Sequence, residues 1–431
     1  MKIINNSEIT SFGGINFVLS EFERKSVGSS INSHLPALAK QSKYTWKDML
    51  YSYWSIFFCG GDCAEDISIN LKPALIKNPL LKLPSPDRLL ERFKALAQPN
   101  IHPTSPRSKS LHQFNFNEPL NQLNINLLKK LGLIKNHGNV LDYDNTFVFA
   151  DKADARHTYQ RRKGYCPGVG MIGQNIVYIE NRNGNSSPES YQSPTLSRMF
   201  EILKNNHIHI NAFRADGASY TLDTLNEIQA NVDKFYIRSK MSASLEEAIR
   251  NVKQWKEIII DEKTCYRGST YFTPFKKIAK RQKKEELLKK YRLVITKEER
   301  EDGQLNLFTG ESYNYRAILT NDFEKTDDEI VLFYNQRGTE EREFDVLKND
   351  FGWNSMPFSR IDQNTVYLII TAICRNLYNY IIQTFSKIYL HLDPSFRIKK
   401  FIFRFICIPA KWIYRSRQYI LKIYGKPELK T

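Results

Sequence analysis

The first part of the chain carries apolar residues at helical spacing. The segment TWKDMLYSYWSIFF predicts a helix with an aromatic-rich face that ends at a Gly-Gly pair. A second helix is expected over roughly 62–74, and a third begins with Ser85 as N-cap and Pro86 at the first helical position. Short helices joined by a tight glycine turn fit either a helix-turn-helix DNA reader or a small helical packing domain.

From residue 139 the pattern alternates with period two, which is typical of strands. NVLDYDNTFVFA predicts a strand that places Asp142 and Asp144 on one face, with Leu141 and Tyr143 on the other. Strands are also expected around 156–165, at QNIVYIE, at HIHINAFRA and at KFYIRSK, with helices at PTLSRMFEILKNN and at 221–230. This succession predicts a layered α/β domain.

The α/β pattern breaks between about 241 and 330. KTCYRGSTYFT and NYRAILTN predict strands, while the basic segment 275–292 predicts a helix with few apolar positions. The later segment 366–385 is strongly apolar but carries Arg375 at its middle, which favours a buried helix over a membrane span. The block 241–330 therefore reads as an insertion into the α/β domain.

The stretch YNQRGTEEREFDVLK predicts a helix with a polar stripe beside an apolar one. Tyr334, Arg337, Glu341 and Lys348 follow one another at steps of three, four and seven, so they share one face of a helix. When the helix is considered alone, ordinary charge pairs on a solvated face are the favoured explanation of such a stripe. Evidence from the rest of the chain is needed to distinguish a solvated charged face from a functional site.

The charge of the chain points to a polyanionic partner. The 431 residues include 63 Lys and Arg, which give a formal net charge of +17 and a pI of about 9.4. This favours nucleic acid or an anionic membrane, and the buried character of the late apolar segment disfavours the membrane. No signal peptide is apparent, and six scattered cysteines without zinc-ligand spacing fit a reducing cytoplasm.

The C-terminal segment 386–431 is both basic and aromatic. It carries 11 Lys and Arg against two acids, with nine aromatic residues interleaved, among them Phe401, Phe403, Phe405 and Trp412. Two interpretations fit this composition: an amphipathic helix that covers the core, or a contact to a nucleic-acid backbone.

Three carboxylates have contexts that suit a shared metal site. They are Asp144 or Asp142 on the first strand, Asp216 at the end of HIHINAFRA, and Glu341 on the late helix. Carboxylates that converge repel one another unless divalent cations lie between them, and such oxygen ligands suit Mg²⁺ or Mn²⁺. A two-metal site on a basic chain fits phosphoryl transfer on nucleic acid.

These residues resemble the signature of the DDE transposases of bacterial insertion sequences. The motifs are D-N-T at 144–146, R-A-D-G at 214–217 and the Tyr/Arg/Glu/Lys spacing Y-x2-R-x3-E-x6-K. The last of these is similar to the IS-four-like superfamily, and the layout is most similar to its thirteen-eighty branch. The likeness covers roughly 139–240 and 330–385.

The resemblance implies an RNase H-like fold with a β-rich insertion, and DNA cleavage followed by strand transfer at one metal site. It implies Asp144, Asp216 and Glu341 as catalytic ligands of Mg²⁺, with Mn²⁺ able to substitute. Asp144 is preferred to Asp142 because the family pattern places Thr two residues after the acid. Tyr334, Arg337 and Lys348 are implied to contact DNA phosphates.

The expected fold class is α/β, with an RNase H-like core, an all-α N-terminal domain before it and a basic helical tail after it. The expected partners are duplex DNA, meaning terminal inverted repeats and target, and a second copy in a homodimer or larger synaptic complex. The expected location is cytoplasmic and nucleoid-associated. The expected segments are 1–125 for DNA binding or dimerisation, 135–240 and 331–385 for the core, 241–330 for the insertion, and 386–431 for the tail.

Two rivals remain open at this point. The first is a catalytically inactive DNA-binding relic of the same fold, and the second is a nuclease that cuts without joining. Inverted repeats flanking the gene would favour the transposase over both.

Overall fold

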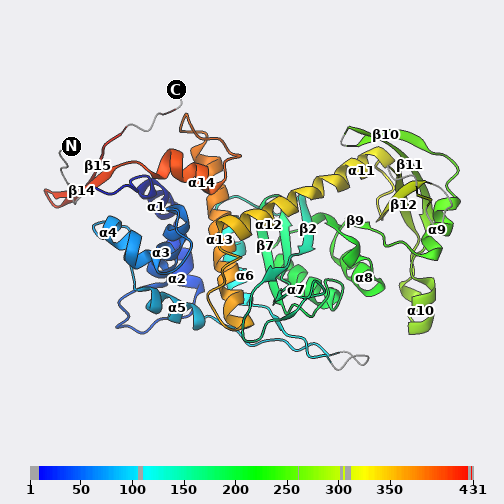
Figure 1. Ribbon diagram of the computed structural model, residues 1–431, viewed down its shortest axis with the longest axis horizontal. Coiled ribbons are helices and arrows are strands. Elements are labelled where there is room, and N and C mark those ends of the chain that lie inside the picture. The colour runs from blue at the N-terminus through cyan, green and yellow to red at the C-terminus, as the bar shows by residue number, and fades with distance from the viewer. Residues whose placement is uncertain are drawn as a thin grey trace.

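The computed structural model describes residues 9–104, 110–260, 262–300, 304–305, 312–425 and 429. Its centre is one ten-stranded sheet, with a group of helices at one end and the sheet's last strands at the other (Figure 1). In spatial order the strands are β1 (Phe114–Asn115), β7 (Asn175–Arg182), β6 (Gly168–Ile172), β2 (Asn139–Asn145), β8 (Ile210–Ala215), β9 (Lys234–Arg238), β13 (Tyr313–Thr320), β12 (Tyr291–Glu299), β11 (Lys263–Phe272) and β10 (Lys256–Ile260).

The middle of the sheet is parallel and its flanks are antiparallel. β2 pairs in parallel with β8, and β8 with β9, whereas β6, β7 and β13 join these strands in antiparallel fashion. Parallel neighbours end at the same edge of the sheet, so the residues that follow β2, β8 and β9 meet there. This edge positions the candidate site.

Helices cover both faces of the central strands. Leu141 and Tyr143 of β2 pack in one core with α7 (Gln192–Asn205) and α8 (Leu222–Asn231). A second core on the other side contains residues of α12 (Thr339–Asp350), α13 (Ile361–Phe385), β6 and β7. The predicted alternation of β2 is therefore confirmed, and its two aspartates face away from α7.

The strands between 241 and 330 extend the sheet. β13 pairs with β9 through Leu319 opposite Ile237, so the expected β-rich block continues the central sheet at one edge. The expected helix over 275–292 is wrong in extent: α10 spans only Lys276–Gln282, a 3-10 turn follows at Glu285–Leu287, and β12 begins at Tyr291. Leu293 and Ile295 of that strand are fully buried, which stabilises an extended chain there.

The N-terminal helices pack onto the core instead of standing apart. They are α1 (Ile15–Arg24), α2 (Val27–His34), α3 (Trp46–Phe58), a π-helical turn (Ile67–Leu71) with α4 (Lys72–Leu75), α5 (Pro86–Lys94) and α6 (Glu118–Lys130).

Every residue of α3 except Lys47 is buried, and the Trp54 indole N–H donates to the carbonyl of Ile370 on α13 at 3.1 Å. A helix enclosed in this way has no face left for a DNA groove, which favours the packing interpretation for α3. The predicted cap at Ser85 is confirmed, and Thr45 caps α3 with a capping box that was not predicted.

The C-terminal segment is a short helix followed by a hairpin. α14 (Ile398–Phe401) runs into a π-helical turn (Ile402–Ile406), and β14 (Ala410–Arg415) then pairs with β15 (Gln418–Ile423). The expectation of a helical tail is therefore wrong for its second half. Phe401 and Phe405 do enter the core, as the covering interpretation requires.

The helix α13 is the centre of the helical part. Among the described residues it is the one helix long and apolar enough to cross a membrane, yet its apolar window is entirely buried inside the protein. Arg375 at its middle pairs with Glu343 of α12 at 2.8 Å. This agrees with the buried helix predicted from the sequence.

The remaining elements are small. They are β3 (Val148–Phe149), β4 (Arg156–His157) and β5 (Lys163–Tyr165), which form a separate three-stranded sheet, and α9 (Ala243–Arg250), which packs beside β11.

Candidate active site

Two aspartates lie next to each other where the parallel strands end. Asp144 lies near the end of β2, and Asp216 follows directly after β8. The two strands pair with Tyr143 opposite Ala215, so the next residue on each strand is one of these aspartates. The carboxyl edge of parallel strands is where α/β proteins bind ligands.

The surroundings of Asp144 disfavour the charged form of its carboxylate. Burial raises its pKa to about 6, the neighbouring Arg337 guanidinium opposes that rise, and the negative charge of Asp216 adds to it. The Asp144 side chain keeps 23% of its surface exposed and accepts a 2.8 Å hydrogen bond from Arg337. Two carboxylates this close favour a cation between or beside them.

Asp216 caps a short 3-10 turn. It precedes Gly217–Ser219, and its Oδ1 accepts the backbone N–H of Ala218 at 2.8 Å. The residue is partly exposed. The cap fixes the orientation of the carboxylate.

Asp142 has a different role from Asp144. Both of its carboxylate oxygens accept hydrogen bonds of 2.6 Å from Arg214 of β8, and Asp142 is only 2% exposed. Arg214 also donates to the carbonyl of Phe333 at 2.6 Å. Asp142 therefore neutralises a buried arginine that ties β8 to the helix above it.

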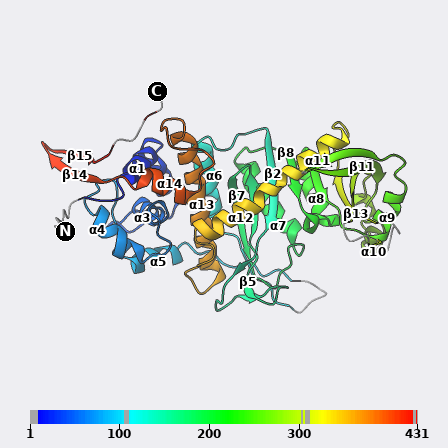
Figure 2. The same ribbon diagram turned by 45° about the horizontal axis from the view of Figure 1, so that its top comes forward.

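The polar stripe lies on two helices. α11 (Asp327–Asn335) ends in a 3-10 turn at Gln336–Gly338 before α12 begins at Thr339. The expectation of one continuous α-helix over 334–348 is thus wrong near its start, where the sequence Gln-Arg-Gly includes the poor helix former Gly338. The two helices together cross the sheet above β2 and β8 (Figures 1 and 2).

Three of the four stripe residues contact the ends of the strands. Tyr334 donates its hydroxyl to the carbonyl of Ala215 at 3.2 Å. Arg337 binds Asp144, and Lys348 donates to the Thr146 hydroxyl at 2.7 Å. Burial raises the pKa of Tyr334 and lowers that of Lys348, so both side chains are partly withdrawn from water.

Glu341 is the exception in the stripe. It lies on α12 one turn after Arg337 and two turns before Lys348, and it is exposed. Its carboxylate makes no hydrogen bond or ion pair with the part of the chain that the structure describes. Tyr334, Arg337 and Lys348 therefore contact residues at the strand ends directly, and Arg337 does so through Asp144. The Glu341 carboxylate has no such contact among the described residues.

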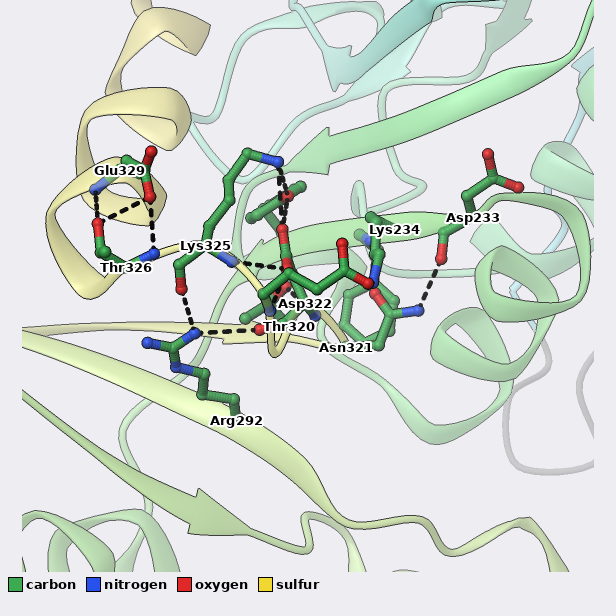
Figure 3. Close-up of polar contacts among 12 residues, drawn as sticks. Asp233, Lys234, Arg292, Thr320, Asn321, Asp322, Lys325, Thr326 and Glu329 are labelled. Carbon is green, nitrogen blue, oxygen red and sulfur yellow. Dashed lines mark hydrogen bonds and ion pairs between the residues drawn. The ribbon is translucent and has the colours of Figure 1, made fainter.

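A polar network fixes the start of α11. Asp322 accepts the Tyr236 hydroxyl at 2.6 Å and the backbone N–H of Glu324 at 2.9 Å, which holds the turn after β13 against β9 (Figure 3). Arg292 donates to the carbonyl of Lys325 at 2.5 Å. Thr326 and Glu329 then form a capping box, as Figure 3 shows. This network sets the position from which Tyr334 and Arg337 reach the site.

Sequence reasoning missed a third residue at the same edge of the sheet. Arg238 ends β9, the next parallel strand, and its positive charge acts on the Tyr334 hydroxyl. Its place at the end of the predicted strand KFYIRSK was the available signal.

Arg238 and Tyr334 also line a groove of about 320 Å³ over β9, β13 and β12, together with Lys263, Lys297 and Arg316. Glu298 lines it as well and pairs with Arg316 at 3.2 Å. The edge therefore carries a cationic surface next to two carboxylates.

Comparison with known proteins identifies the family to which the chain belongs. The family model described as "Transposase DDE domain group 1" matches residues 5–426. No curated protein matches the chain. Among solved structures, the cryo-EM structure of piggyBac transposase synaptic complex with hairpin DNA is similar at 12% identity and a TM-score of 0.44, covering 89% of this chain and 77% of that one.

Proposed function

Since this chain belongs to the Transposase DDE domain group 1 family, we propose that it is the transposase of an insertion sequence. In this proposal it binds the inverted repeats at the element's ends, cleaves the DNA there, and joins the freed 3′-hydroxyl to target DNA. Its place within the family is the IS-four-like superfamily and, more narrowly, the thirteen-eighty branch, on the Tyr/Arg/Glu/Lys spacing.

One observation carries the chemical part of the proposal. Asp144 and Asp216 lie at adjoining strand ends, and a guanidinium from a helix nearly two hundred residues later lies on one of them. Asp142 neutralises the buried Arg214, which is a structural role. The grouping of Asp144, Asp216 and Arg337 is instead typical of a site that acts on a charged substrate.

The donor set fits divalent cations. Asp144, Asp216 and Glu341 are oxygen ligands of the kind that Mg²⁺ and Mn²⁺ prefer. Burial raises the pKa of Asp144 despite the neighbouring Arg337, so a nearby cation would stabilise its charged form. When bound, such cations supply electrostatic stabilisation of the attacking and leaving oxygens in phosphoryl transfer. We assign Glu341 as the third ligand because it follows Arg337 and precedes Lys348 in the predicted stripe and its side chain is exposed.

The cationic residues bind and orient the DNA backbone. Arg337 has a planar fork that suits two phosphate oxygens, so we propose that it exchanges Asp144 for a phosphate when DNA and metal arrive. Lys348 and Tyr334 hold phosphates on either side of it, Tyr334 as a neutral hydroxyl because burial keeps its pKa high. Arg238, at the neighbouring strand end, extends this row of contacts.

The proposed RNase H-like core is built from β7, β6, β2, β8 and β9 with their helices. It falls in two parts of the sequence, 135–240 and 331–385, and the strands β10 to β13 form the insertion at its edge. In this proposal, residues 1–125 and 386–431 contribute to duplex binding and to assembly into a homodimer or larger synaptic complex. Such a protein would work in the cytoplasm on the nucleoid.

Cleavage of the flanking DNA tests the proposal. The purified protein is mixed with a duplex that carries one end of the element, as defined by inverted repeats flanking the gene. Nicking at the repeat boundary with Mg²⁺, its loss with EDTA, and the appearance of joined products with a target duplex are expected. Nicks without joined products would favour the nuclease, and binding without nicks would favour the inactive relic.

A further inference from the structure

The β14–β15 hairpin extends away from the rest of the molecule. Figures 1 and 2 both show it at the extremity of the helical end, beyond α1, far along the molecule from the candidate active site. Its base is anchored to the N-terminal segment: Ala410 exchanges backbone hydrogen bonds of 2.8 and 3.0 Å with Thr10, and the Trp412 indole donates to Asn16 at 3.2 Å. An isolated two-stranded hairpin is marginally stable, so a permanent projection of this kind suits a binding element.

The charges of the hairpin have one sign. Residues 410–425, AKWIYRSRQYILKIYG, contain four cations and no acid. The register places Lys411 directly opposite Lys422 and Arg415 opposite Gln418. Like charges opposite each other destabilise a strand pair, so the hairpin keeps this arrangement against its own stability. A polyanion bound to that face would offset the repulsion between Lys411 and Lys422.

The turn of the hairpin adds a second unfavourable choice. Ser416 and Arg417 both have positive φ, 53° and 62°, where a two-residue hairpin turn usually has Asn-Gly. Non-glycine residues adopt this left-handed region reluctantly. The strained turn puts the exposed Arg417 at the tip of the hairpin. Strain of this kind is retained where the strained residue has a use.

The two faces of the hairpin differ. Alternation along the strands puts Arg415 and Lys422 on one face, with Ile413 and Ile420 between them. The other face carries Trp412, Tyr414 and Tyr419, and the two tyrosine rings lie 4.8 Å apart. On the aromatic face Trp412 contacts Asn16 at the base of the hairpin, whereas the other face presents the exposed Arg415 and Lys422.

From these observations we infer that the β14–β15 hairpin is a second DNA contact, which binds the phosphate backbone of the duplex away from the site of cleavage. Arg415, Arg417 and Lys422 are the binding residues, and all three are exposed. A two-stranded ribbon has the width that the major groove of a duplex admits. A second copy of this chain is a poor occupant, because a chain of net charge +17 would bring further cations against the same face. The inference rests on the proposed function for its partner.

The test uses the full chain and a labelled DNA duplex of arbitrary sequence, since phosphate contacts carry no sequence information. Binding is measured over a series of salt concentrations for the triple variant Arg415→Gln, Arg417→Gln, Lys422→Gln. The matched control, Lys130→Gln, Lys135→Gln, Lys204→Gln, removes the same charge from exposed lysines around the amino ends of β2 and β8. A variant with Arg415→Lys and Arg417→Lys keeps the hairpin's charge.

The hairpin triple variant should bind at least about tenfold more weakly, with a log–log salt slope reduced by about 0.9 for each lost contact. The control triple and the Lys variant should keep the slope of the natural chain. Cleavage of DNA that is already fully bound should proceed at the natural rate, since the hairpin is remote from Asp144 and Asp216.

Three results separate the possible failures. If the natural chain binds and cleaves DNA but the hairpin triple keeps its affinity and slope, or loses no more than the control, the hairpin inference is wrong and the transposase proposal stands. A weaker self-association with unchanged DNA affinity would assign the hairpin to a second copy instead. If the natural chain does not bind DNA at all, the proposed function fails first.

Discussion

The Arg337 guanidinium donates a 2.8 Å hydrogen bond to the Asp144 carboxylate across 193 positions of sequence. This contact joins the late helical segment to the first strand of the sheet at the point where Asp216 also lies. An arginine on an unfavourably placed carboxylate supplies part of the positive charge that a metal would bring. We propose that Arg337 exchanges this contact for a phosphate when DNA and metal bind.

Replacing Arg337 with Lys and replacing Lys348 with Arg should have different effects on the cleavage rate. Arg337→Lys should slow cleavage at least about a hundredfold because a point charge cannot hold two phosphate oxygens in a planar grip. Lys348→Arg should be tolerated better, since its present contact is a single hydrogen bond to Thr146. Single-turnover cleavage by both variants, with thermal melts as the control for folding, makes the comparison. Two fully active and stable variants would mean that the stripe is an ordinary surface.

The two aspartates of β2 should affect stability in opposite directions. Asp142→Asn leaves the buried Arg214 without its counter-charge and should lower the free energy of unfolding by about 3 kcal/mol. Asp144→Asn removes a carboxylate that burial and Asp216 disfavour, so in EDTA it should keep or raise the melting temperature. Thermal melts of both variants check this. A strongly destabilised Asp144→Asn protein would make Asp144 a structural residue.

The raised pKa of Asp144 predicts a pH dependence. Its carboxyl is protonated in the folded protein up to about pH 6 but only to about pH 4 in the unfolded chain, so this group's contribution to stability falls as pH rises through that window. Metal requires the deprotonated form, so the rise in melting temperature produced by Mg²⁺ should be larger at pH 7.5 than at pH 5.5. Melts with Mg²⁺ and with EDTA at both pH values measure it. Asp144→Asn should show no such difference.

The cations of α10 should contribute to binding without affecting chemistry. Lys276, Lys277 and Lys280 are exposed on this short helix. Replacing them with Gln should weaken binding to all DNA sequences and reduce the log–log salt slope by about one unit per lost phosphate contact. A salt titration of duplex binding tests this, with the Lys130, Lys135 and Lys204 triple as its matched control. An unchanged slope would make α10 a solvated helix only.

Local pattern was enough to predict the elements around the site. The alternation of β2, the apolar run of β7 and the N-cap of α5 were predicted because each depends on neighbours in sequence. Asp144 and Asp216 could be paired as candidates because one lies on the first predicted strand and the other at the end of HIHINAFRA, and these strands can be neighbours in an α/β sheet.

Other features depend on distant contacts and could not be predicted in this way. β12 follows a run of lysines and glutamates that favours a helix, but burial of Leu293 and Ile295 decides for a strand. The hairpin turn at Ser416 and Arg417 lacks the usual Asn-Gly signal. The pairing of Asp142 with Arg214 needs two strands to be neighbours, which periodicity does not reveal. The polar stripe was predicted on the assumption of a regular α-helical period, and the 3-10 turn at Arg337 interrupts that period.

The central claim is that Asp144, Asp216 and Glu341 act together as the metal ligands of a DNA-cleaving site. Glu341 is the least constrained of the three, because its carboxylate is exposed and unbonded among the described residues. Its substitution is therefore the sharpest probe, since Glu341→Gln should leave folding and DNA binding intact. Glu343→Gln, two residues later, is the matched control for folding, because Glu343 pairs with the buried Arg375 and should affect stability instead of chemistry.

The most direct measurement is single-turnover cleavage of an element-end duplex with Mg²⁺, with DNA binding measured on the same samples. The natural chain should cleave, while Asp216→Asn and Glu341→Gln should each lose at least about a thousandfold in rate and still bind the duplex. Cleavage by Glu341→Gln at the natural rate would contradict the three-carboxylate site, and loss of DNA binding in parallel with cleavage would make these carboxylates structural.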